Sequence, residues 1–120
     1  MRKKKPNLIA DMTFDFALKT INLYQHLTNE KREFILSKQL LRSGTSIGAN
    51  VREAIVSQSR KEFIAKLNIA LKEAHETEYW LELLQHTSYV SDCESMLKDI
   101  DSIIRIITSI IKTSHENKQS

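Results

Sequence analysis

The chain has 120 residues and a mass of 13.9 kDa, with 41% hydrophobic and 28% charged residues, which fits one globular domain and excludes wholesale disorder. It contains two glycines and one proline, too few for the many turns that a sheet-rich fold of this length needs. The net charge of +3 becomes −1 once the four basic residues at positions 2–5 are set aside, so overall charge only weakly indicates a nucleic-acid partner.

The first helix is predicted over residues 10–27, after a basic, disordered tail at residues 1–9. Apolar side chains recur there at steps of three and four and form one stripe, as expected for a helix with one face in a core. The stripe consists of Phe14, Ala17, Leu18, Ile21 and Tyr24.

A second helix is predicted over residues 31–56, with Asn29 as its N-cap because asparagine side chains accept hydrogen bonds from first-turn amides. Both glycines, Gly44 and Gly48, fall inside this helix, where each costs about 1 kcal/mol relative to alanine. A break at Ser43-Gly44 is the alternative. We expect a continuous helix whose glycines let another backbone approach closely, because the inner positions stay in phase: Leu36, Leu40, Ser43, Ile47, Asn50 and Ala54.

The third helix is the clearest, because Ser59 and Glu62 form a capping box at its start. The serine hydroxyl is expected to accept from the Glu62 amide, and the Glu62 carboxylate from the serine amide. A second box, Ser91 to Glu94, opens the fourth helix, which is predicted to end near residue 113, before a frayed tail at 114–120. In the third helix, steps of four and three typical of bundle packing join Phe63, Leu67, Ala70, Ala74, Thr77, Leu81 and Leu84.

These segments predict one domain over residues 10–113, an all-α, antiparallel up-down four-helix bundle. The fourth segment has a wide apolar face that fills about half of the circumference, whereas a helix within its own bundle needs a stripe of roughly 100°. Two interpretations stay open: burial in a small core, or contact of part of this arc with another subunit. For the second interpretation, the predicted interface residues are Gly44, Gly48, Ile106 and Ile110.

Catalytic and metal-binding patterns are missing from the sequence. The four histidines lack zinc-site spacing, no Glu-x-x-His occurs, and no glycine-rich phosphate loop is present. A thiol in the first turn of a helix can have a lowered pKa, but we favour an unreactive thiol for Cys93, the one cysteine. We expect no catalytic residue, no cofactor, no metal and no small-molecule substrate. The lone cysteine and the lack of a leader or membrane span predict a cytoplasmic protein without a membrane partner.

Polar residues on the second and third helices predict a hydrogen-bonded network that fixes the register of the bundle. Asn50 lies on the inner face, and a buried amide needs partners; an amide at the bundle margin, facing water, is the alternative. In a hairpin that turns near residues 57–59, Arg42 would lie roughly opposite Glu76, so an ion pair within the chain would compensate the positive charge of Arg42. We assign to this network Arg42, Ser43, Ser46, Asn50, Glu53 and Glu76.

Charge is strongly segregated along the chain. Residues 31–72 carry nine basic and three acidic side chains, whereas residues 73–101 carry one basic and eight acidic ones. Four basic residues near the hairpin turn are the candidates for a phosphate-binding surface: Arg52, Arg60, Lys61 and Lys66. We expect no base stacking on single strands at this cluster. A charged end in solvent is the alternative explanation of this cluster.

The second and third helices also resemble a known family. Three stretches, QLLRSGTSIGANVREA (39–54), SRKEFI (59–64) and LKEAHETEYWL (71–81), are similar to the bacterial four-helix bundle protein family. Its members include proteins encoded within intervening sequences of 23S ribosomal RNA genes, and some carry ribosomal-protein names. The resemblance covers residues 10–113. The chain is similar, more distantly, to the accessory protein of diversity-generating retroelements, a basic pentameric bundle that binds the reverse transcriptase and nucleic acid.

The resemblance implies an antiparallel four-helix bundle that assembles into a homopentamer, without a catalytic residue or cofactor. This body is nearly neutral, unlike the basic retroelement relatives, and a common form of the family has glycine in place of Ala54. We expect a non-catalytic ring that binds RNA or a nucleic-acid enzyme through its basic surface; a purely protein-interacting oligomer is the alternative. The family's motif positions fall on Arg42, Ser43, Ser46, Ile47, Asn50, Glu53 and Ala54.

Overall fold

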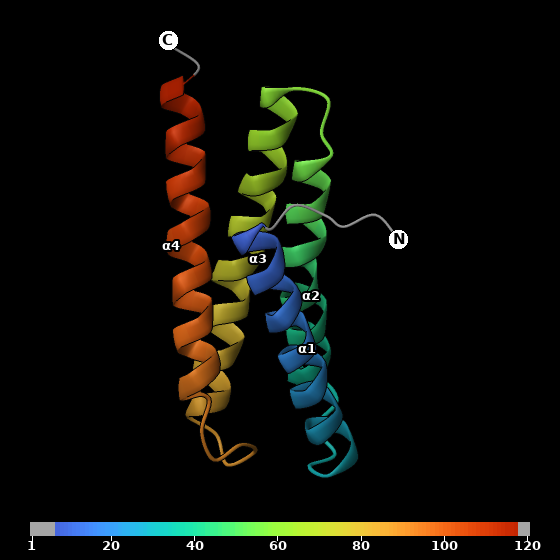
Figure 1. The fold of residues 1–120 in the computed structure, drawn as a ribbon. Coiled ribbons are helices and arrows are strands. Elements are labelled where there is room, and N and C mark those ends of the chain that lie inside the picture. The colour runs from blue at the N-terminus through green and yellow to red at the C-terminus, as the bar shows by residue number, and fades with distance from the viewer. Residues whose placement is uncertain (1–6, 118–120) are drawn as a thin grey trace.

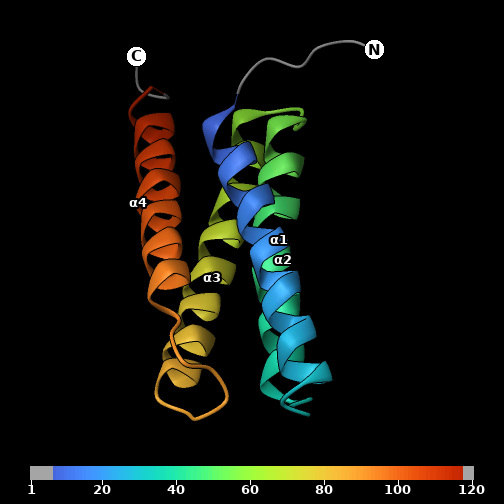
Figure 2. The same cartoon turned by 60° about the horizontal axis from the view of Figure 1, so that its bottom comes forward.

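The computed structural model describes residues 7–117, which form four helices in an antiparallel up-down bundle (Figure 1). The helices are α1 (Leu8–Asn29), α2 (Leu36–Ile55), α3 (Arg60–Gln85) and α4 (Glu94–Asn117), and no strand occurs within the described residues. Each helix packs on two neighbours, so α1 and α3 form one diagonal of the bundle and α2 and α4 the other (Figure 2). The predicted all-α bundle is confirmed.

The bundle is longer at both ends than the sequence predicts. α1 begins at Leu8, where the Asn7 side chain accepts from the Ala10 amide at 3.1 Å, so residues 8 and 9 are helix rather than tail. α4 continues to Asn117, beyond its predicted end near residue 113. The rest of the two predicted tails, residues 1–6 and 118–120, lies outside the described residues.

The start of α2 differs most from the prediction. Asn29 belongs to the last turn of α1, and the N-cap residue of α2 is Ile35, whose side chain forms no capping hydrogen bond; the capping side chain is that of the buried Glu33. Burial raises the pKa of the Glu33 carboxyl, but hydrogen bonds from the backbone outweigh burial and hold the pKa below its ordinary value. The chain enters this cap through Arg32, whose φ of 56° is left-handed. Three successive amides donate to the carboxylate: Ile35 at 3.1 Å, Leu36 at 2.9 Å and Ser37 at 2.7 Å.

The face that α1 turns toward the core is not the stripe predicted from the sequence. Three of its five members face solvent, since Phe14 and Leu18 are each 48% exposed and Ile21 is 36% exposed, whereas Ala17 and Tyr24 are half-buried. The hydroxyls of two buried threonines donate within their own helix, to the carbonyls of Ile9 at 2.8 Å and Phe16 at 2.9 Å, which makes threonine tolerable in a core. The buried residues of α1 are Ile9, Thr13, Phe16, Thr20 and Leu27.

The glycines of α2 make room for these threonines. α2 runs through both glycines without a break, as predicted. A methyl group on Gly44 would lie 2.7 Å from Thr20 Cγ2, and one on Gly48 would lie 3.3 Å from Thr13 Oγ1. The close approach is therefore to α1 of the same chain. This contact replaces the predicted one between the glycines and another subunit.

α3 follows its predicted seam: Leu67, Ala70, Ala74, Thr77, Leu81 and Leu84 are buried, and Phe63 is partly buried. Ser59 accepts from the Glu62 amide at 3.1 Å, as predicted. The Glu62 carboxylate, however, accepts at 3.1 Å from the amide of Gln58, not from that of the serine.

α4 begins at Glu94, whose amide donates to the Asp92 side chain at 2.8 Å, so Asp92 takes the place that was predicted for Ser91. The middle of its apolar arc is buried, at Ile100, Ile103 and Ile107. Ile106 and Ile110 are partly buried and pack against the same core. The core of this bundle thus accounts for the larger part of the arc.

Candidate nucleic-acid interface

The ion pairs of the predicted network lie along the contact between α2 and α3. Arg42 binds the carboxylates of both Glu76 and Glu73, the latter at 3.3 Å. Glu76 also accepts from the indole nitrogen of Trp80 at 3.0 Å. Arg42 and Glu76 meet as the hairpin geometry predicts, and the Arg42 charge is compensated inside the chain.

Closer to the bundle axis, one buried hydroxyl pair joins the two helices. Ser43 Oγ and Thr77 Oγ1 are hydrogen-bonded at 2.9 Å. Ser46 and Asn50 do not extend this link, since each donates to a carbonyl of its own helix, at 2.6 Å and 2.9 Å. Asn50 is partly exposed, so its predicted place in an interhelix network is corrected to that of an amide at the bundle margin.

Glu53 pairs with one of the four predicted phosphate ligands. Its carboxylate lies 2.8 Å from Lys66 Nζ, across the α2–α3 contact. The hydrogen bond and the negative charge of Glu53 raise the pKa of Lys66 above its ordinary value. Glu53 therefore belongs to this ion pair and not to the Arg42 network, and Lys66 already has an anionic partner.

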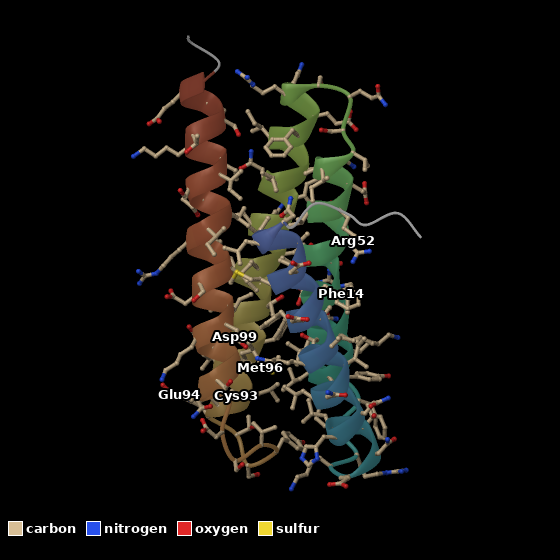
Figure 3. All side chains as sticks on the ribbon, in the orientation of Figure 1. Phe14, Arg52, Cys93, Glu94, Met96 and Asp99 are labelled. Carbon is tan, nitrogen blue, oxygen red and sulfur yellow. The ribbon has the colours of Figure 1, made fainter. Side chains whose placement is uncertain are left out.

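Arg52 lies on the flank of α2 that faces α1, whereas Glu53 lies on the flank that faces α3. Its guanidinium carbon is 5.2 Å from the centre of the Phe14 ring, the geometry of a cation–π contact (Figure 3). An aromatic ring thus lies beside one of the four basic residues. The ring comes from α1, far away in the sequence, so only the fold could place it beside the arginine.

Arg60 and Lys61 occupy the first turn of α3, and both are exposed. Together with Ile64 and with His115 of α4, they line an open cavity of about 450 Å³. A second open cavity of about 430 Å³ adjoins Arg60 and the α2–α3 turn. The structure thus distributes the four predicted ligands over three places: Arg52 toward α1, Lys66 toward α2, and Arg60 with Lys61 at the end of the bundle.

Cys93 does not have the properties of a reactive thiol. It is buried at the start of α4, and its amide donates to the side chain of Gln85. Burial, with a smaller contribution from the Asp92 charge, raises the pKa of the thiol, opposite to the effect of a helix dipole. The unreactive interpretation fits this environment.

No active-site arrangement stands out in the part of the chain that the structure covers. No group of three His, Cys, Asp or Glu side chains is placed to hold a metal ion within residues 7–117. Every buried polar side-chain atom described has a hydrogen-bond partner, so none is left aimed at a ligand. Among the four helices, none combines the length and apolarity needed to cross a bilayer.

These features define a helical bundle whose polar residues mostly join its helices to one another, with cations exposed where α2 meets α3. The sequence model of the 23S rRNA-intervening sequence proteins matches residues 5–109, and the chain belongs to that family, as its motifs predicted. It is similar to the crystal structure of a protein of unknown function from the S23 ribosomal protein family of Bacteroides thetaiotaomicron VPI-5482. The two share 57% identity over 87% of this chain and 98% of the other, with a TM-score of 0.85. None of the curated proteins compared with the chain matches it.

Proposed function

We propose that this protein is a non-catalytic cytoplasmic scaffold that assembles into a homo-oligomer and binds RNA at the end of the bundle where α2 meets α3. The observation that carries RNA binding is the pair Arg60 and Lys61, which are exposed and form no ion pair with a described side chain. They lie at the N-terminus of a 26-residue helix, where the helix dipole also attracts phosphate. Membership in a family named for intervening sequences of 23S rRNA supports an RNA partner.

The other two candidate ligands contribute less to this surface. Lys66 binds Glu53, so a phosphate would have to compete with a carboxylate at 2.8 Å. Arg52 forms no ion pair with a described side chain, but it lies on the Phe14 ring, toward the flank of the bundle. The proposed contact is therefore centred on Arg60 and Lys61, with Arg52 at its edge.

The experiment compares two double variants of equal net charge. Arg60→Gln/Lys61→Gln removes the proposed contact, and Lys31→Gln/Lys38→Gln removes two exposed cations near the opposite end of α2. Fluorescence anisotropy with a short labelled single-stranded RNA, between about 50 and 200 mM salt, measures affinity and salt dependence. We expect the first variant to lose about one unit of log–log salt slope for each cation removed, and the second to bind like the wild type. Equal binding by both variants and the wild type would refute the proposal.

A purely protein-interacting oligomer is the second candidate function, and it follows from a different observation. Three apolar side chains of α1 face solvent in one chain: Phe14, Leu18 and Ile21. Exposed apolar stripes are typical of surfaces that another protein covers. This candidate predicts that the wild-type protein assembles but retains no RNA at moderate salt. The family resemblance sets the expected number of subunits at five.

A further inference from the structure

Along the bodies of the helices, two groups of large apolar side chains are exposed, and they lie on diagonal helices; the other exposed ones lie at helix ends and in turns. The α1 stripe is formed by Phe14, Leu18 and Ile21, at steps of four and three, which place all three on one outward face. Scattered exposed apolar residues are ordinary, but an outward stripe with regular helical spacing marks a packing surface.

The second surface lies on the outward side of α3. Ile69 is 43% exposed, Tyr79 55% and Leu83 36%. Ile69 and Leu83 are about four turns apart on the same side of the helix, and Tyr79 lies one turn before Leu83. We call these three residues the α3 face. α1 and α3 do not contact each other within the chain, so the α1 stripe and the α3 face are separate surfaces.

We propose that the α1 stripe of one copy of this chain packs on the α3 face of a second copy. The proposal rests on the self-association put forward above and assigns the surfaces that perform it. One head-to-tail contact of this kind covers both apolar surfaces at once. A two-fold contact of the α1 stripe with itself would leave the α3 face in water. Because the two surfaces differ, repetition of the contact adds subunits until the ring closes.

The charges left unpaired beside the two surfaces are complementary, because Glu73 and Glu76 next to the α3 face already bind Arg42. Asp15 follows Phe14 on α1 and is exposed, and Lys72 lies between Ile69 and Tyr79 on α3 and is also exposed. Neither forms an ion pair with a described side chain of its own chain. Packing of the two surfaces brings the Asp15 carboxylate toward the Lys72 ammonium group, which favours this pairing over α1 on α1.

The same observations disfavour RNA as the occupant of the α1 stripe. Leu18 and Ile21 offer no hydrogen bonds and no ring for a base to stack on, and Asp11 and Asp15 are carboxylates that repel phosphate. Phe14 would serve as an anchor at the end of a protein contact, where aromatic side chains are enriched.

Cysteine cross-linking in the full chain tests the pairing directly. The double variant Leu18→Cys/Ile69→Cys, oxidised under dilute conditions, should give a ladder of covalent oligomers that ends at the number of subunits in the ring. Each single variant should stay uncross-linked, and so should the wild type, because Cys93 is buried. A disulfide dimer of Leu18→Cys alone would show α1 on α1 and overturn the proposal, as would a double variant without a ladder.

Native mass spectrometry of charged variants provides the second measurement. Leu18→Arg should reduce the assembled wild type to single subunits, whereas Thr108→Arg, at an exposed position on α4 away from both surfaces, should leave the subunit count unchanged. Asp15→Lys and Lys72→Asp should each weaken assembly at least tenfold, and together restore it. An assembled Leu18→Arg variant would overturn this pairing alone, and a monomeric wild type would overturn self-association as well. If the wild type is a monomer that retains RNA and the Leu18→Arg variant loses that RNA, then RNA occupies the α1 stripe and the proposal is overturned.

Discussion

Replacement of Gly44 by alanine should destabilise the bundle, although alanine is the better helix former by about 1 kcal/mol. The new methyl carbon would lie 2.7 Å from Thr20 Cγ2 and 2.8 Å from Thr20 Oγ1. Apolar carbons normally stay about 3.5–4.0 Å apart, so the overlap with the threonine methyl is about 1 Å. Thr20 cannot rotate away freely, because it is buried and its hydroxyl binds the Phe16 carbonyl at 2.9 Å.

Gly48→Ala is the matched control, since its methyl group would lie 3.3 Å from Thr13 Oγ1, a contact that a small shift accommodates. Overpacking costs about 1–3 kcal/mol, which the helix propensity of alanine offsets by about 1 kcal/mol. We therefore expect Gly44→Ala to lose up to about 2 kcal/mol of unfolding free energy, and Gly48→Ala to lose nothing or gain up to about 1 kcal/mol.

Urea unfolding followed by circular dichroism measures these differences. Adding Thr20→Ala to Gly44→Ala should recover stability, because it removes both atoms that lie within 3 Å of the new methyl group. If Gly44→Ala proves as stable as Gly48→Ala, the contact between these glycines and threonines does not set the spacing of α1 and α2.

Three other predictions follow from particular side chains. Glu33→Gln should cost about 1–2 kcal/mol of unfolding free energy at neutral pH. Since folding lowers the pKa of Glu33, the advantage of the wild type should be complete above about pH 4.3 and should shrink as the pH falls through the lower folded-state pKa. Urea titrations that show the same difference at every pH would contradict this prediction. Glu53→Gln frees Lys66 and should steepen the salt dependence of RNA binding by about one phosphate contact, whereas an unchanged slope in anisotropy titrations would remove Lys66 from the RNA surface. Cys93 should react with Ellman's reagent far more slowly in the native protein than in urea, and equal rates would show that the thiol is accessible.

The helices that follow their predictions best are those whose inner residues are apolar or small at regular steps. In α3, the alternation of leucine and alanine leaves a single face that can be buried, and Thr77 lies on that face and is buried with it. In α1, a stripe of Phe14, Leu18 and Ile21 has the pattern of a core face but lies outside. The buried face instead contains Thr13 and Thr20, which look polar in the sequence and are satisfied by carbonyls of their own helix. Periodicity alone does not distinguish a core face from a surface that another protein covers.

The candidate site was predictable only where partners follow from antiparallel register. Arg42 and Glu76 are roughly equally far from the hairpin turn, so their ion pair could be predicted from the sequence. The contact of Arg52 with Phe14 depends on the packing of α1 against α2, and no local pattern predicts it. Glu33 was missed because Asn29 has the commoner cap residue type, and a carboxylate that caps from outside the helix has no fixed spacing.

The outward stripe of α1 would also link folding to the proposed assembly. This helix packs on α2 through threonines set against glycines, with Phe14, Leu18 and Ile21 turned away from its own core. A solitary chain therefore gains less from folding α1 than its composition suggests, and a neighbouring copy would supply the remainder. Mass action then requires the melting temperature to rise as the protein is concentrated, and α1 to exchange its amide protons fastest in dilute solution.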